Sequence, residues 1–256
     1  MSPPVFVPCW VAGASGYSGR AVVAELRRLG YPTIAHVRPD SRDRTALEAA
    51  FSALGASVDL SPWQTEALQA AFERHRPGVV FALLGTTRAR AAEAKRQGKD
   101  PAAESYDAID VGLTLMLVRA AKTLAEAGEA PTLVYLSSMG ADRPGPSAYL
   151  QARARVEQEL RGSGLPFVIA RPAAITGGDR PEARPLERFF ARAGDFALDG
   201  LAALGADGVR RRFASMDSAT LAAGLVRAAF DESQRGHALD AEWLRGAGGG
   251  GGGDAR

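Results

Sequence analysis

A serine, a tyrosine and an arginine stand at a spacing that could support proton transfer to a carbonyl oxygen. Ser138 follows an apolar run, Thr132 to Leu136, that predicts a buried strand, and Tyr149 comes eleven residues later at the start of a helical pattern. Arg153 lies four residues after Tyr149, so the two side chains share one helical face. A phenol with a pKa near ~10 becomes a useful acid or base at neutral pH when a nearby cation stabilises its phenolate. We therefore predict catalytic roles for all three: Tyr149 exchanges the proton, Ser138 holds the reacting oxygen and Arg153 supplies the cation.

A glycine cluster near the N-terminus could bring backbone amides against a phosphate. Gly13, Gly16 and Gly19 stand three residues apart, directly after an apolar run and directly before a helical pattern. Gly13 permits the tight turn, Gly16 leaves room for a pyrophosphate, and Gly19 lets the helix pack closely on the sheet. The helix N-terminus then aims its free N–H groups at the phosphates. The candidate cofactor-binding residues of this turn are Gly13, Ser15, Gly16, Tyr17, Ser18 and Gly19.

The elements around this turn decide between a phosphate site and a purely structural turn. Arg20 to Leu29 has helical spacing, and Thr33 to Val37 has the pattern of a short buried strand. A strand, a helix and a second strand within about thirty residues form a βαβ unit with both strands parallel in one sheet. This context favours dinucleotide binding by the glycine motif.

The residues after the second strand distinguish two cofactors. An NAD site typically places a carboxylate here, whereas this chain has Arg38, Arg42 and Arg44. Guanidinium groups bind phosphate oxygens with paired, charge-assisted hydrogen bonds, so these three arginines predict NADP through its 2′-phosphate, with Arg38 and Arg42 as candidate cofactor-binding residues. Asp40 could still reach a ribose hydroxyl, which keeps NAD open. A solvated basic loop is the alternative to both.

The ends of two further predicted strands are expected to face the cofactor. Asp59 and Leu60 are predicted beside the adenine, and Leu84, Gly85 and Thr86 along the cofactor.

The segment from Ser61 to Gln64 is predicted to be the capped start of the next helix, because serine, proline and glutamine are typical of such a start. A long helical run follows from Ser105 to Ala127, in which Asp107 and Asp110 are expected to favour the helix dipole.

The alternation of strands and helices predicts an α/β fold, a Rossmann-type doubly wound parallel sheet. We predict a single NAD(P)-binding domain over residues 1–245. Within it, residues 172–245 are expected to contribute a small C-terminal substrate-side lobe. Residues 246–256 are rich in glycine and predict a flexible tail.

Composition and charge limit which ligands, partners and cellular compartment are expected for this protein. The net charge is +2 over 256 residues, with basic residues spread along the chain, which argues against nucleic acid. Cys9 is the only cysteine, so we predict a reducing compartment, by default the cytoplasm. His36, His75 and His237 show no metal-ligand spacing, so no metal is predicted. The apolar start from Val5 to Ala12 is much shorter than the ~20 residues of a membrane span, so no membrane contact is expected.

Several motifs along the first two thirds of the chain point to one family. They are Gly13-x-x-Gly16-x-x-Gly19, Leu84-Gly85-Thr86-Thr87-Arg88, Leu136-Ser137-Ser138-Met139-Gly140-Ala141-Asp142, Tyr149-Leu150-Gln151 and Arg171-Pro172. Together they resemble the atypical short-chain dehydrogenase/reductase family, and within it the NmrA-like and Tat-interacting-protein-like NAD(P)-binding branch. The resemblance implies that Ser138 and Tyr149 are catalytic and that Pro172 and Ile175 line the nicotinamide end.

The chain departs from this family pattern at one catalytic position. The family has lysine four residues after the tyrosine, whereas this chain has Arg153. Arginine keeps its proton and needs more room than lysine. A lysine at position 153 is therefore expected to preserve or raise activity.

Two classes of function remain open. One is an NADP-dependent oxidoreductase that acts on a small carbonyl or alcohol by hydride transfer. The other is a dinucleotide-binding regulatory or scaffold protein that binds a protein partner. In this case the change to Arg153 reflects the loss of catalytic activity. A nucleotide-sugar epimerase is a weaker third, because the region after Gly178 offers few features for a large sugar nucleotide. The sequence does not name the substrate, the reaction direction or the oligomeric state.

Overall fold

The protein is built on a parallel β-sheet. The computed structural model describes residues 6–86, 95–98, 100–173, 175 and 216–248. Within this part of the chain, seven strands stand in the order β3-β2-β1-β4-β5-β6-β7, and every neighbouring pair is parallel. The strands are β1 Cys9–Ala12, β2 Thr33–His36, β3 Ser57–Asp59, β4 Val79–Ala82, β5 Thr132–Leu136, β6 Phe167–Arg171 and β7 Ala238–Asp240. The predicted Rossmann-type α/β fold is confirmed.

Burial on both faces explains why these short apolar segments form strands. Every residue of β1, β2, β4 and β5 is buried, as is typical of a parallel sheet covered on both sides. Successive side chains point to opposite faces. Cys9 and Val11 join one apolar cluster, whereas Trp10 and Ala12 join the other. The sheet therefore lies between two layers of helices.

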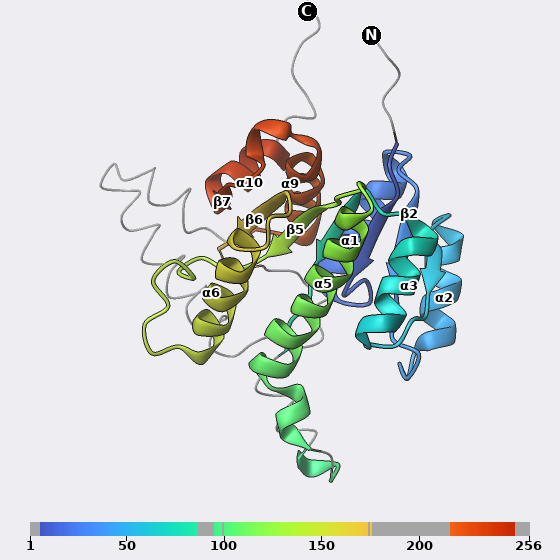
Figure 1. The fold of residues 1–256 in the computed structure, drawn as a ribbon, viewed down its shortest axis with the longest axis horizontal. Coiled ribbons are helices and arrows are strands. Elements are labelled where there is room, and N and C mark those ends of the chain that lie inside the picture. The colour runs from blue at the N-terminus through green and yellow to red at the C-terminus, as the bar shows by residue number, and fades with distance from the viewer. Residues whose placement is uncertain (1–5, 87–94, 99, 174, 176–215, 249–256) are drawn as a thin grey trace, which may run out of the picture.

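Each face of the sheet has its own set of helices (Figure 1). On one face lie α1 Tyr17–Arg28, α2 Arg44–Ala53, α9 Ser218–Phe230 and α10 Ala241–Gly248. On the other lie α3 Thr65–His75, α5 Thr114–Glu126 and α6 Ala148–Arg161. The π-helix η2 Tyr106–Leu113 follows the 3-10 turn η1 Pro101–Glu104 and runs directly into α5, and the 3-10 turn η3 Glu232–Gln234 follows α9. The long helical run predicted from Ser105 to Ala127 is thus a π-helix that continues as an α-helix.

The order of the strands reverses at β1, which has β2 on one side and β4 on the other. In open α/β sheets, the crevice outside the carboxyl ends of the strands at such a switch point is the usual ligand site. The loops after β1, β4, β5 and β6 therefore determine what this protein can bind.

Helix α3 begins later than the sequence predicted. Its N-terminal cap is Gln64, which makes no side-chain capping hydrogen bond, and its first residue is Thr65. The Ser61 amide instead donates to the Asp59 carboxylate at 2.8 Å, which holds the chain in a loop. Trp63 consequently stands in a loop beside the switch point.

The C-terminal part of the described chain belongs to the sheet and its helical layer. Strand β7 pairs with β6, and α9 packs between α1 and α10. Helix α10 extends to Gly248, three residues into the segment predicted as a tail. Residues 176–215, which hold most of the predicted substrate-side lobe, and residues 249–256 of the predicted tail lie outside the described residues.

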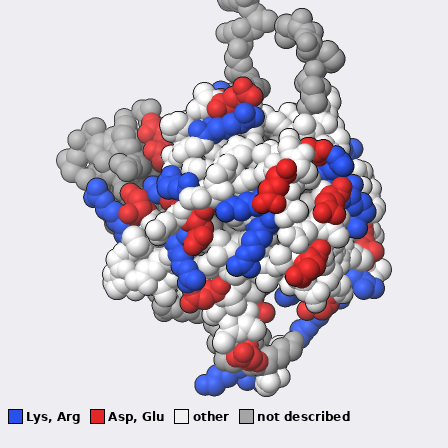
Figure 2. Space-filling view, in the orientation of Figure 1, with Lys and Arg blue, Asp and Glu red and all other residues white. Residues whose placement is uncertain are grey.

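Side chains of both charges are interspersed on the face that Figure 2 shows, so neither sign dominates there. Among the helices of the described residues, none is both long enough and apolar enough to cross a bilayer.

Candidate active site

Two cavities open at the carboxyl ends of the central strands. The tyrosine cavity, named here for Tyr149 in its wall, has a volume of about 150 Å³. The tryptophan cavity, named for Trp63, has a volume of about 140 Å³. The residues that line both are Gly16, Leu83, Leu84 and Gly85. The two cavities therefore form one groove across the switch point, the place where a dinucleotide binds in this class of fold.

Most of the predicted site residues line this groove. The tryptophan cavity is lined by Gly13, Ser15, Gly16, Arg38, Leu84 and Gly85. The tyrosine cavity is lined by Gly16, Tyr17, Ser18, Gly19, Leu84, Gly85, Ser138, Tyr149, Arg153, Pro172 and Ile175. The remaining candidates are Arg42, Asp59, Leu60 and Thr86, which line neither cavity.

The glycine turn has room for a phosphate at one position. Gly13 has a φ of +80°, and a Cβ there would lie 2.7 Å from the carbonyl oxygen of Leu83. A Cβ at Gly19 would collide with the carbonyl group of Gly13. At Gly16, the neighbour that a Cβ would meet among the described atoms is the Gly13 oxygen at 3.2 Å, so its remaining side is open. Because Gly16 also caps the N-terminus of α1, this cradle fits a pyrophosphate.

Aromatic rings and an arginine line the tryptophan cavity. The Trp63 ring stands edge-on to the His36 ring with centroids 4.7 Å apart, and His36 stacks on the buried Trp10 ring at 5.3 Å. A His36 ring nitrogen, Nε2, lies 2.8 Å from the Ser61 carbonyl oxygen. Burial lowers the pKa of His36, so this ring is neutral at neutral pH. With Arg38 in the same wall, the cavity suits a flat base and a phosphate group.

Asp59 does not face the adenine end of the groove as predicted. Its side chain is 4% exposed and accepts hydrogen bonds from the Ser61 amide at 2.8 Å and from Arg74 at 2.5 Å. The His75 ring lies 3.0 Å from the same carboxylate. Although burial opposes the charged form, hydrogen bonds from Ser61, His75 and Arg74 lower the pKa of Asp59 to about 2. Asp59 therefore ties the end of β3 to the end of α3.

The other three candidates outside the cavities have partners of their own. Arg42 donates from Nη2 to the Gln97 side-chain oxygen at 3.1 Å. Leu60 packs against the apolar cluster under α1 and α2. The Thr86 residue is buried, and its amide donates to a carboxylate oxygen of Asp110 at 3.0 Å. Leu60 thus belongs to the apolar packing of the sheet, and the Thr86 backbone is tied to Asp110.

The two serines after β5 differ in their partners. Ser137 is buried, and its hydroxyl donates to Glu157 at 2.7 Å. Glu157 also accepts hydrogen bonds from Arg171 at 2.9 and 2.5 Å, so Ser137 belongs to a closed polar cluster. Among the described residues, the Ser138 hydroxyl makes a long contact of 3.4 Å with the Met139 carbonyl. Ser138 therefore has the hydroxyl that a ligand can engage.

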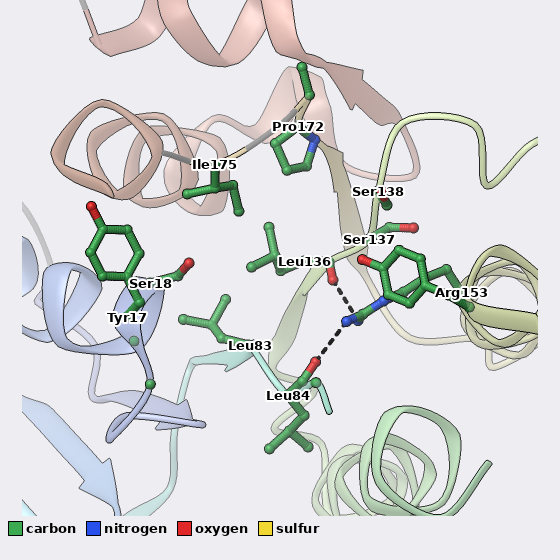
Figure 3. A pocket seen from close by; sticks show the side chains of 15 residues that line it. Tyr17, Ser18, Leu83, Leu84, Leu136, Ser137, Ser138, Arg153, Pro172 and Ile175 are labelled. Carbon is green, nitrogen blue, oxygen red and sulfur yellow. Dashed lines mark hydrogen bonds between the residues drawn. The ribbon is translucent and has the colours of Figure 1, made fainter. Parts of the chain in front are cut away.

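Arg153 is a buried residue held by the backbone. It is 3% exposed, and its Nη1 donates to the Tyr135 hydroxyl at 3.1 Å and the Leu136 carbonyl at 2.9 Å. Its Nη2 donates to the Leu84 carbonyl at 3.1 Å and pairs with Asp110 at 2.8 Å. Figure 3 shows the two carbonyl bonds, with Arg153 on the side of the cavity opposite α1. The guanidinium therefore joins the ends of β4 and β5 to α6.

The contact between Arg153 and Tyr149 is with the face of the ring. The guanidinium carbon lies 5.1 Å from the centroid of the Tyr149 ring. Burial opposes the charge of Arg153, but Tyr135, Tyr149 and Asp110 raise its pKa above the ordinary value, so the charge is retained. Burial also raises the pKa of Tyr135 to about 12, so this phenol stays protonated.

Asp110 is a site residue that the sequence analysis did not identify. It is fully buried, and its two carboxylate oxygens face the Thr86 amide and Arg153. Its position near a helix start suggested a role with the helix dipole. The overlooked signal is that Asp110 lies between Ile109 and Val111, on an apolar stretch that a solvated carboxylate would not interrupt. Trp63 was missed for a related reason, because its segment has the composition of a helix start.

Comparison with known proteins shows the family to which this chain belongs. A family model described as NAD(P)H-binding matches residues 13–194. A relative in Aspergillus oryzae, "Protein fmp52-1, mitochondrial", is 34% identical over 182 residues, which cover 68% of each chain. The chain belongs to the NAD(P)H-binding atypical short-chain dehydrogenase/reductases. The finer assignment to the NmrA-like branch stays a prediction.

Solved structures support the fold of this family member. A protein described as an NAD-dependent epimerase/dehydratase from Bacillus halodurans is 15% identical with a TM-score of 0.62, over 94% of this chain and 99% of that one. AtPrR2, solved with NADP+ and (+)pinoresinol, is 16% identical with a TM-score of 0.64, over 93% of this chain and 70% of that one. At these identities the likeness concerns the fold alone.

The predicted cytoplasmic location is wrong by this comparison. The Aspergillus oryzae relative of this short-chain dehydrogenase/reductase is named as a mitochondrial protein. A single cysteine argues against a disulfide framework, but it does not distinguish one reducing compartment from another.

Proposed function

We propose that this short-chain dehydrogenase/reductase is an NADP(H)-dependent oxidoreductase that acts on a small carbonyl or alcohol. The observation that carries the proposal is the meeting of Ser138, Tyr149 and the Gly16 turn in the wall of one cavity. A hydroxyl donor, a phenol and a phosphate cradle are the groups that carbonyl reduction requires of the protein. The same groups serve alcohol oxidation when the phenol accepts the proton instead.

The groove supports a dinucleotide that extends across the switch point. Gly16 would hold the pyrophosphate, Trp63 the adenine and Arg38 a 2′-phosphate, since all three line the tryptophan cavity. Pro172 and Ile175 would line the nicotinamide end, in the tyrosine cavity. When bound there, the nicotinamide would give or take a hydride.

The residues of the tyrosine cavity divide the remaining work. The Tyr149 phenol would donate its proton to the substrate oxygen in reduction, or accept one in oxidation. The Ser138 hydroxyl would donate a hydrogen bond to the same oxygen and fix its position. Leu83 and Leu136 lie between the walls, as Figure 3 shows, and would exclude water from the reacting atoms.

The wider organisation remains part of this proposal. We propose a single domain over residues 1–245, in which Pro172 and Ile175 stand on the substrate side while β7, α9 and α10 complete the sheet and its helical layer. The proposed ligands are the cofactor and a small-molecule substrate, without nucleic acid, membrane or metal.

The test is turnover of a carbonyl panel. Purified protein with NADPH would be given benzaldehyde, cyclohexanone and 1,4-benzoquinone, and the loss of NADPH absorbance followed. We expect turnover of at least one carbonyl, at a rate that Tyr149→Phe lowers about 10² to 10⁴-fold. NADPH that binds without turnover of any compound would contradict the oxidoreductase assignment.

One observation favours the regulatory or scaffold alternative. The guanidinium of Arg153 is held by backbone carbonyls and Asp110, so it has a fixed structural task where the family has lysine. Under this alternative, NADPH would stabilise the fold to heat, whereas Tyr149→Phe would leave every redox rate at background. Thermal unfolding and the carbonyl panel, measured on the same preparations, separate the two functions.

A further inference from the structure

We propose that the π-helix η2 is a clamp that positions the ring of Tyr149, with Tyr106 and Asp110 as its positioning residues. The inference rests on the proposed function, in which Tyr149 handles the proton. The proposal gives η2 a role in the site in addition to that of α6, although the side chains of η2 need not contact the substrate.

The Tyr149 ring is flanked by two groups that restrict its orientation. The Tyr106 ring, at the start of η2, lies with its centroid 5.5 Å from that of Tyr149, at an interplanar angle of 56°. The Arg153 guanidinium carbon lies 5.1 Å from the same ring. One of these groups comes from η2, and the other comes from the same helix as Tyr149 itself.

Asp110 fixes the second of these groups. Its Oδ1 lies 2.8 Å from Nη2 of Arg153, and its Oδ2 accepts the Thr86 amide at 3.0 Å. Because Asp110 is fully buried, its ion pair with Arg153 lies in a low-dielectric environment, where the attraction between the two charges is stronger than in water. The carboxylate therefore links η2 to α6 and to the chain after β4 at a single point.

The π geometry belongs to this arrangement. Segments of π-helix are rare, and they are found frequently at functional sites. Here the segment begins at a cap, where the Ser105 hydroxyl accepts the Ala108 amide, and ends where the Thr114 hydroxyl donates to the Asp110 carbonyl at 2.7 Å. The clamp is thus fixed at both ends before it meets α6.

A third contact between the same helices supplies a matched control. Asp107 of η2 pairs with Arg155 of α6 at 3.1 Å, but their side chains are 79% and 59% exposed. An exposed pair of this kind contributes little. Asp107→Asn therefore changes the same helix pair without touching the clamp.

The experiment compares Tyr106→Leu and Asp110→Asn with Asp107→Asn, using NADPH and the carbonyl of the panel that wild type turns over fastest. Tyr106→Leu should lower kcat on the order of tenfold while KM and NADPH affinity stay within about twofold, since the ring is misplaced and the binding groups are not. Asp107→Asn should match wild type. A Tyr106→Leu variant with wild-type kcat would overturn the proposal.

A double variant separates positioning from a general structural effect. If Tyr106 acts through Tyr149, then Tyr106→Leu should cause no further loss in a Tyr149→Phe background. A further loss of the same size in that background would show a structural role and overturn the positioning claim.

Hydrogen exchange at the amides of residues 150–153, measured without cofactor, gives a readout that needs no turnover. Asp110→Asn should speed this exchange on the order of tenfold or more relative to Asp107→Asn, because it removes the buried link between η2 and α6. If wild type turns over no carbonyl, the proposed function fails, and faster exchange in Asp110→Asn still supports the clamp. Equal exchange in the two variants would overturn the clamp even in an active enzyme.

Discussion

At position 153, two guanidinium nitrogens donate three hydrogen bonds, to the Tyr135 hydroxyl and two backbone carbonyls, and one of them also forms an ion pair with the Asp110 carboxylate. A lysine has one nitrogen with three hydrogens and cannot reach all of them at once. These contacts lead us to expect the opposite of the prediction from the sequence, which was that lysine at this position would preserve or raise activity. A buried group left without its partner costs about 1 to 3 kcal/mol.

We therefore predict that Arg153→Lys lowers the free energy of unfolding by about 1 to 3 kcal/mol, measured in urea, together with turnover. Arg155→Lys is the matched control, because Arg155 makes an exposed ion pair on the same helix. A lysine variant as stable and active as wild type would show that the hydrogen bonds of Arg153 contribute little.

Arg38 is the residue on which cofactor preference should depend. Its side chain lines the tryptophan cavity and is 47% exposed, with its ion pair to Asp40 at a loose 3.8 Å. Arg38→Ala should weaken NADPH binding about tenfold or more, the value of one hydrogen bond to a charged group, and leave NADH binding nearly unchanged. Arg44→Ala is the control, since Arg44 pairs with Glu48 on its own helix. Calorimetry that finds equal losses for both cofactors would remove the argument for a 2′-phosphate.

At the scale of elements, the three glycines of the turn between β1 and α1 have different roles: two are needed for folding and one for binding. Gly13 and Gly19 have no space for a Cβ, whereas Gly16 has space on the side of the groove. Gly19→Ala should therefore lower the melting temperature clearly, because the helix must move away from the turn. Gly16→Val should abolish NADPH binding with near wild-type circular dichroism and melting temperature. Normal NADPH affinity in Gly16→Val would place the phosphates elsewhere.

The elements themselves could be predicted where local chemistry decides them. The strand Thr132–Leu136 has the bounds that its sequence pattern predicts. The start of α3 could not be predicted, because the hydrogen bond between Ser61 and Asp59 depends on where β3 ends in three dimensions. The same holds for η2, since no local pattern separates a π turn from an α turn.

The site shows the same division between local and tertiary information. The glycine turn, Ser138 and Tyr149 could be found because their chemistry follows from residue type and spacing. The roles of Asp59 and Asp110 could not be predicted, because each depends on an ion pair with a residue distant in sequence. Asp59 pairs with Arg74, and Asp110 pairs with Arg153.

At the scale of the whole molecule, Asp59 should contribute to stability in a pH-dependent way. Its folded-state pKa of about 2 lies below the ordinary value of 3.8, so the folded protein binds fewer protons. The contribution is therefore complete above pH ~4 and is lost as the pH falls toward about 2. The lowering corresponds to about 2 kcal/mol.

Asp59→Asn should thus lower the free energy of unfolding by about 2 kcal/mol at neutral pH, and the difference from wild type should vanish near pH 2. Urea unfolding at a series of pH values measures this directly. A difference that stays constant down to pH 2 would mean that the charge of Asp59 is not what stabilises the end of β3.

The central claim for the molecule is that its groove delivers a proton through Tyr149 to a bound carbonyl. The most direct measurement is the rate of NADPH-dependent carbonyl reduction in Tyr149→Phe, together with the NADPH affinity of the same preparation. Removing the phenol hydroxyl with little change in volume should lower turnover about 10² to 10⁴-fold, the usual contribution of general acid catalysis, and leave NADPH affinity nearly normal. An active wild type whose rate is indifferent to Tyr149→Phe would contradict the account and assign the proton to another group in the groove.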